Sequence, residues 1–140
     1  MGRQSVMIAV AIAAFGAGGC HRQSHAEDAQ VVGAWRFQQL ADPDHQLGPV
    51  QTKTLTQANT SRVDEFKSDN TYTVSSNNGQ PSTGTWSASG GTITMTSAPT
   101  PNGARARDTA SLSSDGTTLS FDEGGGGVKL VFEKMHSLPQ

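Results

Sequence analysis

From residue 31 onward, the chain is a series of short alternating runs separated by turn-forming residues. Alternation of large or apolar side chains with Thr and Ser is typical of β-strands that bury one face. No apolar repeat of about 3.6 residues, the spacing of an amphipathic helix, extends over a useful length. The segments that we expect to be strands are 33–37, 50–56, 62–67, 71–75, 83–87, 92–96, 104–112, 117–121 and 128–132.

Turn residues stand between these segments at a spacing of roughly 8–12 residues, which is typical of an all-β meander. Asn70 tolerates the left-handed conformation of a tight turn, and Gly90-Gly91 joins two runs as a hairpin. The glycine run 124–127 predicts another hairpin turn, and prolines in 38–49 and 97–103 predict loops. Eight antiparallel strands can close on themselves and leave no exposed sheet edge. We therefore predict an all-β fold, an antiparallel meander closing into a small eight-stranded barrel over residues 31–136.

The N-terminal segment has the composition of an export signal. Arg3 supplies a positive charge, residues 6–17 are apolar, and small residues at 17–19 precede Cys20. This apolar run is shorter than the roughly 20 residues that a helix needs to span a bilayer. Cys20, the only cysteine of the chain, resembles the lipobox cysteine of bacterial lipoproteins, which becomes the lipid-modified N-terminus. The resemblance implies a signal peptide over residues 1–19 and a lipidation site at Cys20.

Ordinary secretory cleavage is the alternative, because Ala17-Gly18-Gly19 and Ser24-His25-Ala26 both offer small residues to a signal peptidase. The placement of the single cysteine in this slot favours lipidation. Residues 21–30 contain no apolar side chain larger than Ala, so we expect residues 20–30 to be a lipidated N-terminus and flexible tether. By resemblance to the known sorting rule, His rather than Asp at position 21 favours the outer membrane, facing the periplasm, in a Gram-negative host.

The net charge and the single cysteine limit which partners and cross-links we expect for this chain. The formal net charge is −2, and it becomes −3 when Arg3 leaves with the signal. No Lys/Arg-rich run is present in the sequence, so we expect no nucleic acid partner. One cysteine forms no intramolecular disulfide, and stability has to come from a packed core. The expected partners are the membrane, through the N-terminal lipid, and either a small apolar ligand or an envelope protein.

The sequence offers no recognisable catalytic motif. There is no nucleophile elbow, no His-Glu-x-x-His and no phosphate loop. The adjacent carboxylates Asp64-Glu65 and Asp122-Glu123 would point to opposite faces of a strand, so neither pair can act together as glycosidase carboxylates. We therefore expect no enzyme activity, no catalytic residue and no cofactor.

Two groups of residues have side chains that can bind a metal ion. His21 and His25 lie near Cys20, but lipidation would consume the thiol, and two histidines give no closed coordination site. Asp42 and His45 share one loop with Asp44, although Asp and Pro are also common in turns. We expect no metal site.

Short motifs in the predicted strands resemble bacterial lipocalin-like lipoproteins. They are Gly33-x-Trp35 on the first strand, Phe66 ahead of an Asp-Asn turn into Thr71-Tyr72-Thr73, Gly84-Thr85-Trp86, and Ser114-Asp115-Gly116 before the penultimate strand. The resemblance runs from Val31 to about Met135 and implies a lipocalin-like barrel. Lipocalins pack a late arginine over the first-strand tryptophan by a cation–π contact. This chain offers Lys129 and Lys134 near its end.

The candidates for ligand binding are four aromatic residues, Trp35, Phe37, Tyr72 and Trp86. Lipocalin-like barrels can enclose an apolar cavity, which these side chains would line. The alternative is that they fill the core, since an eight-stranded barrel is just wide enough for its own side chains. Core filling is favoured because these aromatics are the bulk of the large residues available to fill it.

These observations predict a cell-envelope lipoprotein whose lipocalin-like barrel binds a small apolar or amphipathic ligand. The alternative is a protein-interaction lipoprotein, such as an inhibitor or immunity protein against an envelope hydrolase, and a structural envelope component is a third hypothesis. An open cavity lined by Trp35, Tyr72 and Trp86 would favour ligand binding. A filled interior with one protruding loop at 97–103 would favour a protein partner.

Overall fold

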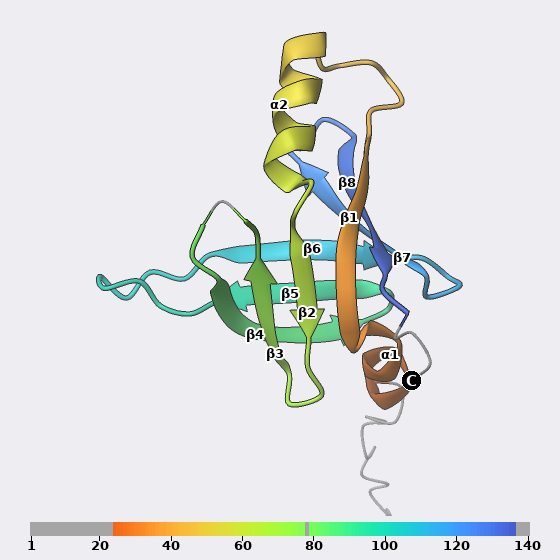
Figure 1. Cartoon of the computed structure of the whole chain (residues 1–140). Coiled ribbons are helices and arrows are strands. Elements are labelled where there is room, and N and C mark those ends of the chain that lie inside the picture. Colours follow the sequence, from red (N-terminus) through yellow and green to blue (C-terminus); the bar gives the residue numbers. More distant parts are fainter. Residues whose placement is uncertain (1–23, 78, 137–140) are drawn as a thin grey trace, which may run out of the picture.

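The computed structural model describes residues 24–77 and 79–136. Its core is a closed barrel of eight antiparallel strands, in which each strand pairs with its neighbours in the sequence and β8 pairs with β1 (Figure 1). The predicted all-β barrel is confirmed. The strands are β1 (Gly33–Ala41), β2 (Val63–Phe66), β3 (Thr71–Ser75), β4 (Ser82–Ser89), β5 (Thr92–Ser97), β6 (Arg107–Leu112), β7 (Thr118–Glu123) and β8 (Val128–Lys134).

The tight turns fall where the sequence places them. Asn70 has a φ of 64° between β2 and β3, a left-handed conformation that Asn tolerates. Gly90 and Gly91, with φ values of 60° and 77°, join β4 to β5, and Gly124 to Gly127 join β7 to β8. Because each strand pairs antiparallel with the next one along the chain, and β8 returns to β1, the sheet closes as an antiparallel meander.

A helix occupies part of the chain that the alternation predicts to be a strand. Residues 50–56 belong to α2 (Pro49–Asn59), which corrects the expected strand. Pro49 suits the first position of a helix, and the Gln51 side chain accepts a hydrogen bond from the Gly48 amide at 2.9 Å. Threonines along α2 donate to carbonyls four residues earlier, as Thr54 does to Val50 at 2.9 Å. Alternating Thr in this stretch therefore did not indicate a strand.

A second helix lies in the segment expected to be a flexible tether. Residues Ser24–Val31 form α1, which corrects that expectation for the described part of 20–30. The helix is held by the barrel: the Gly90 amide donates to Glu27 at 3.0 Å, the Lys134 ammonium donates to the Gln30 carbonyl at 2.6 Å, and Val31 is buried. One large apolar residue and several polar contacts hold α1 against the barrel. The sequence of α1 therefore shows no apolar pattern that would predict a helix. Residues 1–19 and Cys20 lie outside the described residues.

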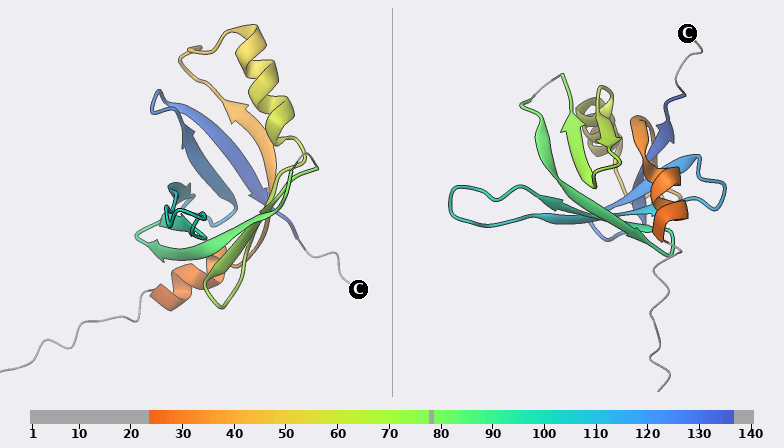
Figure 2. Two further views of the ribbon diagram at one scale, coloured as in Figure 1. Left: turned by 90° about the vertical axis from the view of Figure 1, so that its left-hand side faces the viewer. Right: turned by 90° about the horizontal axis from the view of Figure 1, so that it is seen from below.

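The two helices mark the two ends of the barrel (Figures 1 and 2). We call the end that carries α1 and the β2–β3, β4–β5 and β6–β7 turns the closed end. The opposite end, which carries α2 and the segments 76–77, 79–81, 98–106 and 124–127, is the open end. Neither helix in the described residues is long and apolar enough to cross a bilayer.

Alternation along the strands sorts side chains between the interior and the solvent. Trp35 and Phe37 are buried while Arg36 between them is exposed, as predicted. Thr and Ser occupy many of the outward positions, including Thr85 and Ser87 on β4. The interior of the closed end is packed with large side chains, among them Trp35, Phe66, Trp86, Ile93, Leu119 and Phe132.

Candidate functional site

Trp35 ties three elements together at the closed end. Its side chain is 0% exposed, and its indole N–H donates to the Val31 carbonyl of α1 at 2.8 Å. The Lys134 ammonium lies 5.4 Å from the ring centroid, within the range of a cation–π contact. Lys134 thus takes the place that a late arginine takes in lipocalins, and burial lowers its pKa. This end of the barrel is a structural cap in which large buried side chains pack together.

The four predicted ligand-binding aromatics occupy different environments. Phe37 packs edge-on against Phe132, with ring centroids 5.8 Å apart, and Trp86 packs edge-on against Phe66 at 5.6 Å. Trp35, Phe37 and Trp86 therefore sit in the packed core. Tyr72 alone of the four lines the two pockets described below.

The open end of the barrel holds a pocket of about 400 Å³. We call it the mouth pocket. Its residues come from the inward positions of β3, β4, β5 and β6 and from the connections that lead into β2 and β6. It is lined by Arg62, Tyr72, Val74, Ser82, Met95, Ser97, Ala106 and Asp108. Half-buried or buried apolar groups form its wall, and charged or hydroxyl groups stand at its base and rim, as is common in small-molecule sites.

A buried ion pair lies at the base of the mouth pocket. Arg62 precedes β2, and its Nε and Nη2 donate to the two carboxylate oxygens of Asp64, each at 2.8 Å. The guanidinium carbon also lies 5.1 and 5.0 Å from the ring centroids of Phe121 and Phe132. Asp64 is 0% exposed. The barrel interior therefore contains a bidentate pair held against aromatic rings.

Burial sets the proton affinity of this pair. Desolvation raises the pKa of Asp64 above its ordinary value, and the Arg62 guanidinium partly offsets that rise. Asp108 at the pocket rim raises the pKa of Asp64 further. Glu65, the neighbour of Asp64, is exposed on the outer face, so the predicted separation of these two carboxylates is correct.

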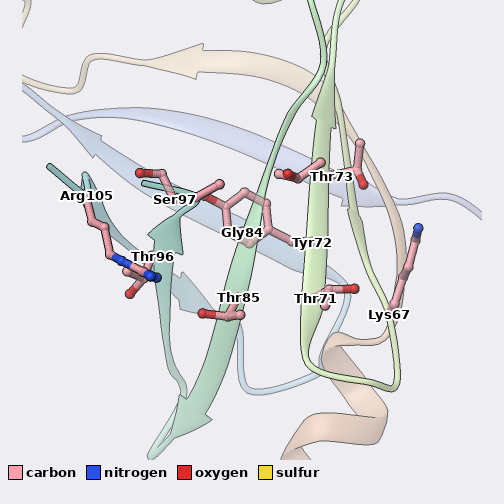
Figure 3. Close-up of a pocket in the computed structure, with 11 residues that line it drawn as sticks. Lys67, Thr71, Tyr72, Thr73, Gly84, Thr85, Thr96, Ser97 and Arg105 are labelled. Atoms are coloured by element: carbon pink, nitrogen blue, oxygen red, sulfur yellow. The ribbon is translucent and has the colours of Figure 1, made fainter. Parts of the chain in front are cut away.

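A second pocket of about 290 Å³ lies on the barrel wall beside β3, β4 and β5 (Figure 3). We call it the outer groove. Lys67 and Arg105 flank it and threonine hydroxyls line it. Tyr72 and Ser97 line both pockets, so they form the wall between them. Gly84 makes this arrangement possible, because a Cβ there would lie 2.1 Å from the Thr96 carbonyl oxygen and 2.7 Å from the Tyr72 ring.

The loop that carries Asp42, Asp44 and His45 has a structural explanation. The Asp42 carboxylate accepts hydrogen bonds from the amides of Gln46 and Leu47, both at 2.9 Å, and these bonds lower the pKa of Asp42. The aspartate thereby shapes the chain that leads into α2. His25 lies on α1, and His21 lies outside the described residues. Within residues 24–77 and 79–136, no group of three or more metal-binding side chains comes together.

Several residues of the mouth pocket were not singled out by the sequence. Arg62, Met95 and Asp108 each lie in an ordinary alternating run of the sequence, where nothing marks them as pocket residues. The available signal was Asp64, which shares an inward strand face with Phe66. A charged residue at an inward position needs a partner, and Arg62 lies two residues away.

Comparison with known proteins agrees with this architecture. Residues 31–124 match a family described as lipocalin-like domain. A lipocalin-like protein from Bacteroides uniformis is similar in structure, with a TM-score of 0.50 and 17% identity over 76% of this chain and 99% of that chain. A DUF4847 family protein from Bacteroides vulgatus has a TM-score of 0.49 and 20% identity over 79% of this chain and 99% of that chain. No curated protein matches the chain.

Proposed function

The chain belongs to the lipocalin-like domain family, and on that premise we propose that it is a cell-envelope lipoprotein whose barrel binds a small amphipathic ligand. The mouth pocket is the observation that carries the proposal. It combines an apolar wall, formed by Tyr72, Val74 and Met95, with polar groups at its base and rim. Its volume of about 400 Å³ is at the small end of ligand pockets. A binding role without catalysis accords with this fold, since the pocket offers no nucleophile paired with a general base.

A filled-pocket variant tests ligand binding. Val74 is half-buried and lines the mouth pocket, so Val74→Phe should fill part of the space that a ligand needs. We expect calorimetry with octanol to show binding to the mature chain carrying Cys20→Ser and at least tenfold weaker binding to its Val74→Phe version, because the ligand loses buried apolar contact. Val50→Phe is the matched control, since Val50 on α2 is 78% exposed. Equal octanol affinity in the two variants would exclude the mouth pocket as the site.

The alternative of a protein partner has one observation in its favour. Much of the interior is packed, while the connection between β5 and β6 projects from the barrel (Figure 2) and α2 exposes Val50 beside Leu47 and Leu55. Failure of octanol to bind, together with a stoichiometric complex with an envelope hydrolase that is abolished by changes in 98–106, would favour the inhibitor function.

The anchor places the barrel on the membrane by its closed end. Cys20 precedes α1 by only a few residues, and four residues span at most about 14 Å. Because α1 docks on the closed end, lipidation of Cys20 would hold that end near the bilayer and leave the mouth pocket facing away from it. We place the protein at the outer membrane, facing the periplasm, by the same sorting rule that position 21 satisfies.

Cys20→Ser tests the anchor. The thiol is the only lipid acceptor of its kind in the chain, so we expect the variant to be released from membranes or to keep its signal peptide. Membrane fractionation followed by mass determination distinguishes the two results from retention. A mature variant that stays in the membrane fraction as fully as the wild type would contradict lipid anchoring. Ser24→Ala serves as a control, since it leaves the thiol in place and keeps a small residue at the candidate cleavage site of residues 24–26.

A further inference from the structure

The charges of the mouth pocket indicate which head group its ligand carries. Arg62 and Asp108 are the two charged side chains that line it. Arg62 is already engaged, because two of its N–H donors bind Asp64 at 2.8 Å and its guanidinium lies over two aromatic rings. The positive charge of Arg62 is thus largely neutralised by a carboxylate behind it. An anion that approached Arg62 would also meet Asp64.

Asp108 is the other charged side chain that lines the mouth pocket. It lies opposite Met95 in the β5–β6 pairing, and Met95 is buried in the interior, so the Asp108 side chain is on the inward face of β6 at the rim. One of its oxygens accepts the Thr109 amide at 2.8 Å. Within the described part of the chain it forms no ion pair. Burial raises the pKa of both Tyr72 and Asp64, and the negative charge of Asp108 adds to each rise.

The neighbouring cations do not compensate Asp108 inside the pocket. Arg107 alternates with Asp108 on β6 and pairs with the outward Thr96, and Arg105 lines the outer groove. Arg62, Asp64 and Asp108 together carry one net negative charge, which favours a positive ligand group over a negative one. The apolar surface of Val74, Met95 and Tyr72 lies beside it.

We propose that the mouth pocket selects a small cationic amphiphile, with its ammonium group at Asp108 and its apolar chain against Val74, Met95 and Tyr72. This inference rests on the proposed function and adds the charge of the ligand to it. An ammonium group at the rim keeps part of its hydration while it gains a charge-assisted hydrogen bond. An anionic amphiphile of the same length would meet the net negative charge and lose affinity.

Three probes of equal chain length test the selection: octylammonium, octanol and octanoate. In calorimetry at pH 7 and low salt, the mature chain carrying Cys20→Ser should bind octylammonium about fivefold more tightly than octanol, and octanoate more weakly than octanol. The added variant Asp108→Asn should reduce the preference for octylammonium to less than about twofold and leave octanol affinity unchanged. Asp122→Asn is the matched control, because Asp122 is exposed on β7 outside the pocket. Higher salt should weaken the preference, since Asp108 is exposed to solvent.

The outcomes separate this inference from the proposed function. If none of the three probes binds, both fail. If octanol binds and octanoate binds as tightly as octylammonium, or if the preference survives Asp108→Asn, ligand binding stands and the cationic selection is overturned. A shift of the Met95 methyl resonance on titration with octylammonium, absent in Val74→Phe, would locate the probe in the mouth pocket. A probe that leaves this resonance unmoved would also overturn the inference.

Discussion

Replacing Arg62 by methionine is expected to lower the free energy of unfolding by about 3–5 kcal/mol at pH 7, because it leaves a buried carboxylate without its partner. Methionine keeps an unbranched apolar stem of similar length against Phe121 and Phe132, so most of the loss reports the charge rather than the packing. Asp64 is 0% exposed, so Arg62→Met leaves its carboxylate in the interior and removes the guanidinium that neutralises it. Urea denaturation followed by circular dichroism measures the change.

The same variant should be less damaging in acid. Burial raises the pKa of Asp64 in the fold above its unfolded value of about 3.9, so between the two values the folded state binds more protons than the unfolded state. Stability therefore falls as the pH rises through that window. Arg62 limits the rise in pKa, and Arg62→Met widens the window upward. The destabilisation should be smallest near pH 4 and grow toward pH 7.

A double variant controls for the loss of packing. In Arg62→Met/Asp64→Val both charges are replaced by apolar groups, so no carboxylate remains buried, and most of the lost stability should return. A cost for Arg62→Met that is the same at pH 4 and pH 7, or that persists in the double variant, would show that Asp64 is not the source of the effect.

The sequence predicts this barrel well because alternation of inward and outward side chains is visible in the sequence and is also what forms the barrel core. Alternation of Trp35, Arg36 and Phe37 predicts which side chains face inward, and Asn70 predicts the position of a hairpin turn. Alternation gives the wrong prediction for the segment around Val50, and the reason is physical. Alternating Thr suits a strand, but Thr can also donate a hydrogen bond to the carbonyl four residues earlier in a helix. Gly48 and Pro49 favour the start of a helix at this point.

The mouth pocket was harder to predict because its parts come from segments far apart in the chain. Arg62, Met95 and Asp108 meet only when the meander closes, and each looks ordinary within its own run. Tyr72 was found because an aromatic residue at an inward position is conspicuous. The same criterion also selected Trp35, Phe37 and Trp86, which lie in the packed core, because aromatic character predicts burial and does not distinguish a filled interior from an open one.

Trp35→Ala is expected to lower the free energy of unfolding by about 3–5 kcal/mol, the usual cost of emptying a large aromatic site in a core. Arg36→Ala on the same strand should cost less than about 0.5 kcal/mol, since Arg36 is exposed on the opposite face. Trp35→Phe separates the ring from its N–H. It should lose about 1–2 kcal/mol, because the Val31 carbonyl loses its donor at 2.8 Å.

The loss in Trp35→Ala should also reach beyond β1. The Lys134 ammonium lies 5.4 Å from the centroid of the Trp35 ring and donates a hydrogen bond to the Gln30 carbonyl of α1 at 2.6 Å. Without the ring, α1 loses the Trp35 hydrogen bond and an ordered position for Lys134. Hydrogen exchange of the α1 amides should therefore accelerate more in Trp35→Ala than in Trp86→Ala, a change of equal size in the same core. Equal acceleration in both variants would show that α1 depends on overall stability and not on Trp35.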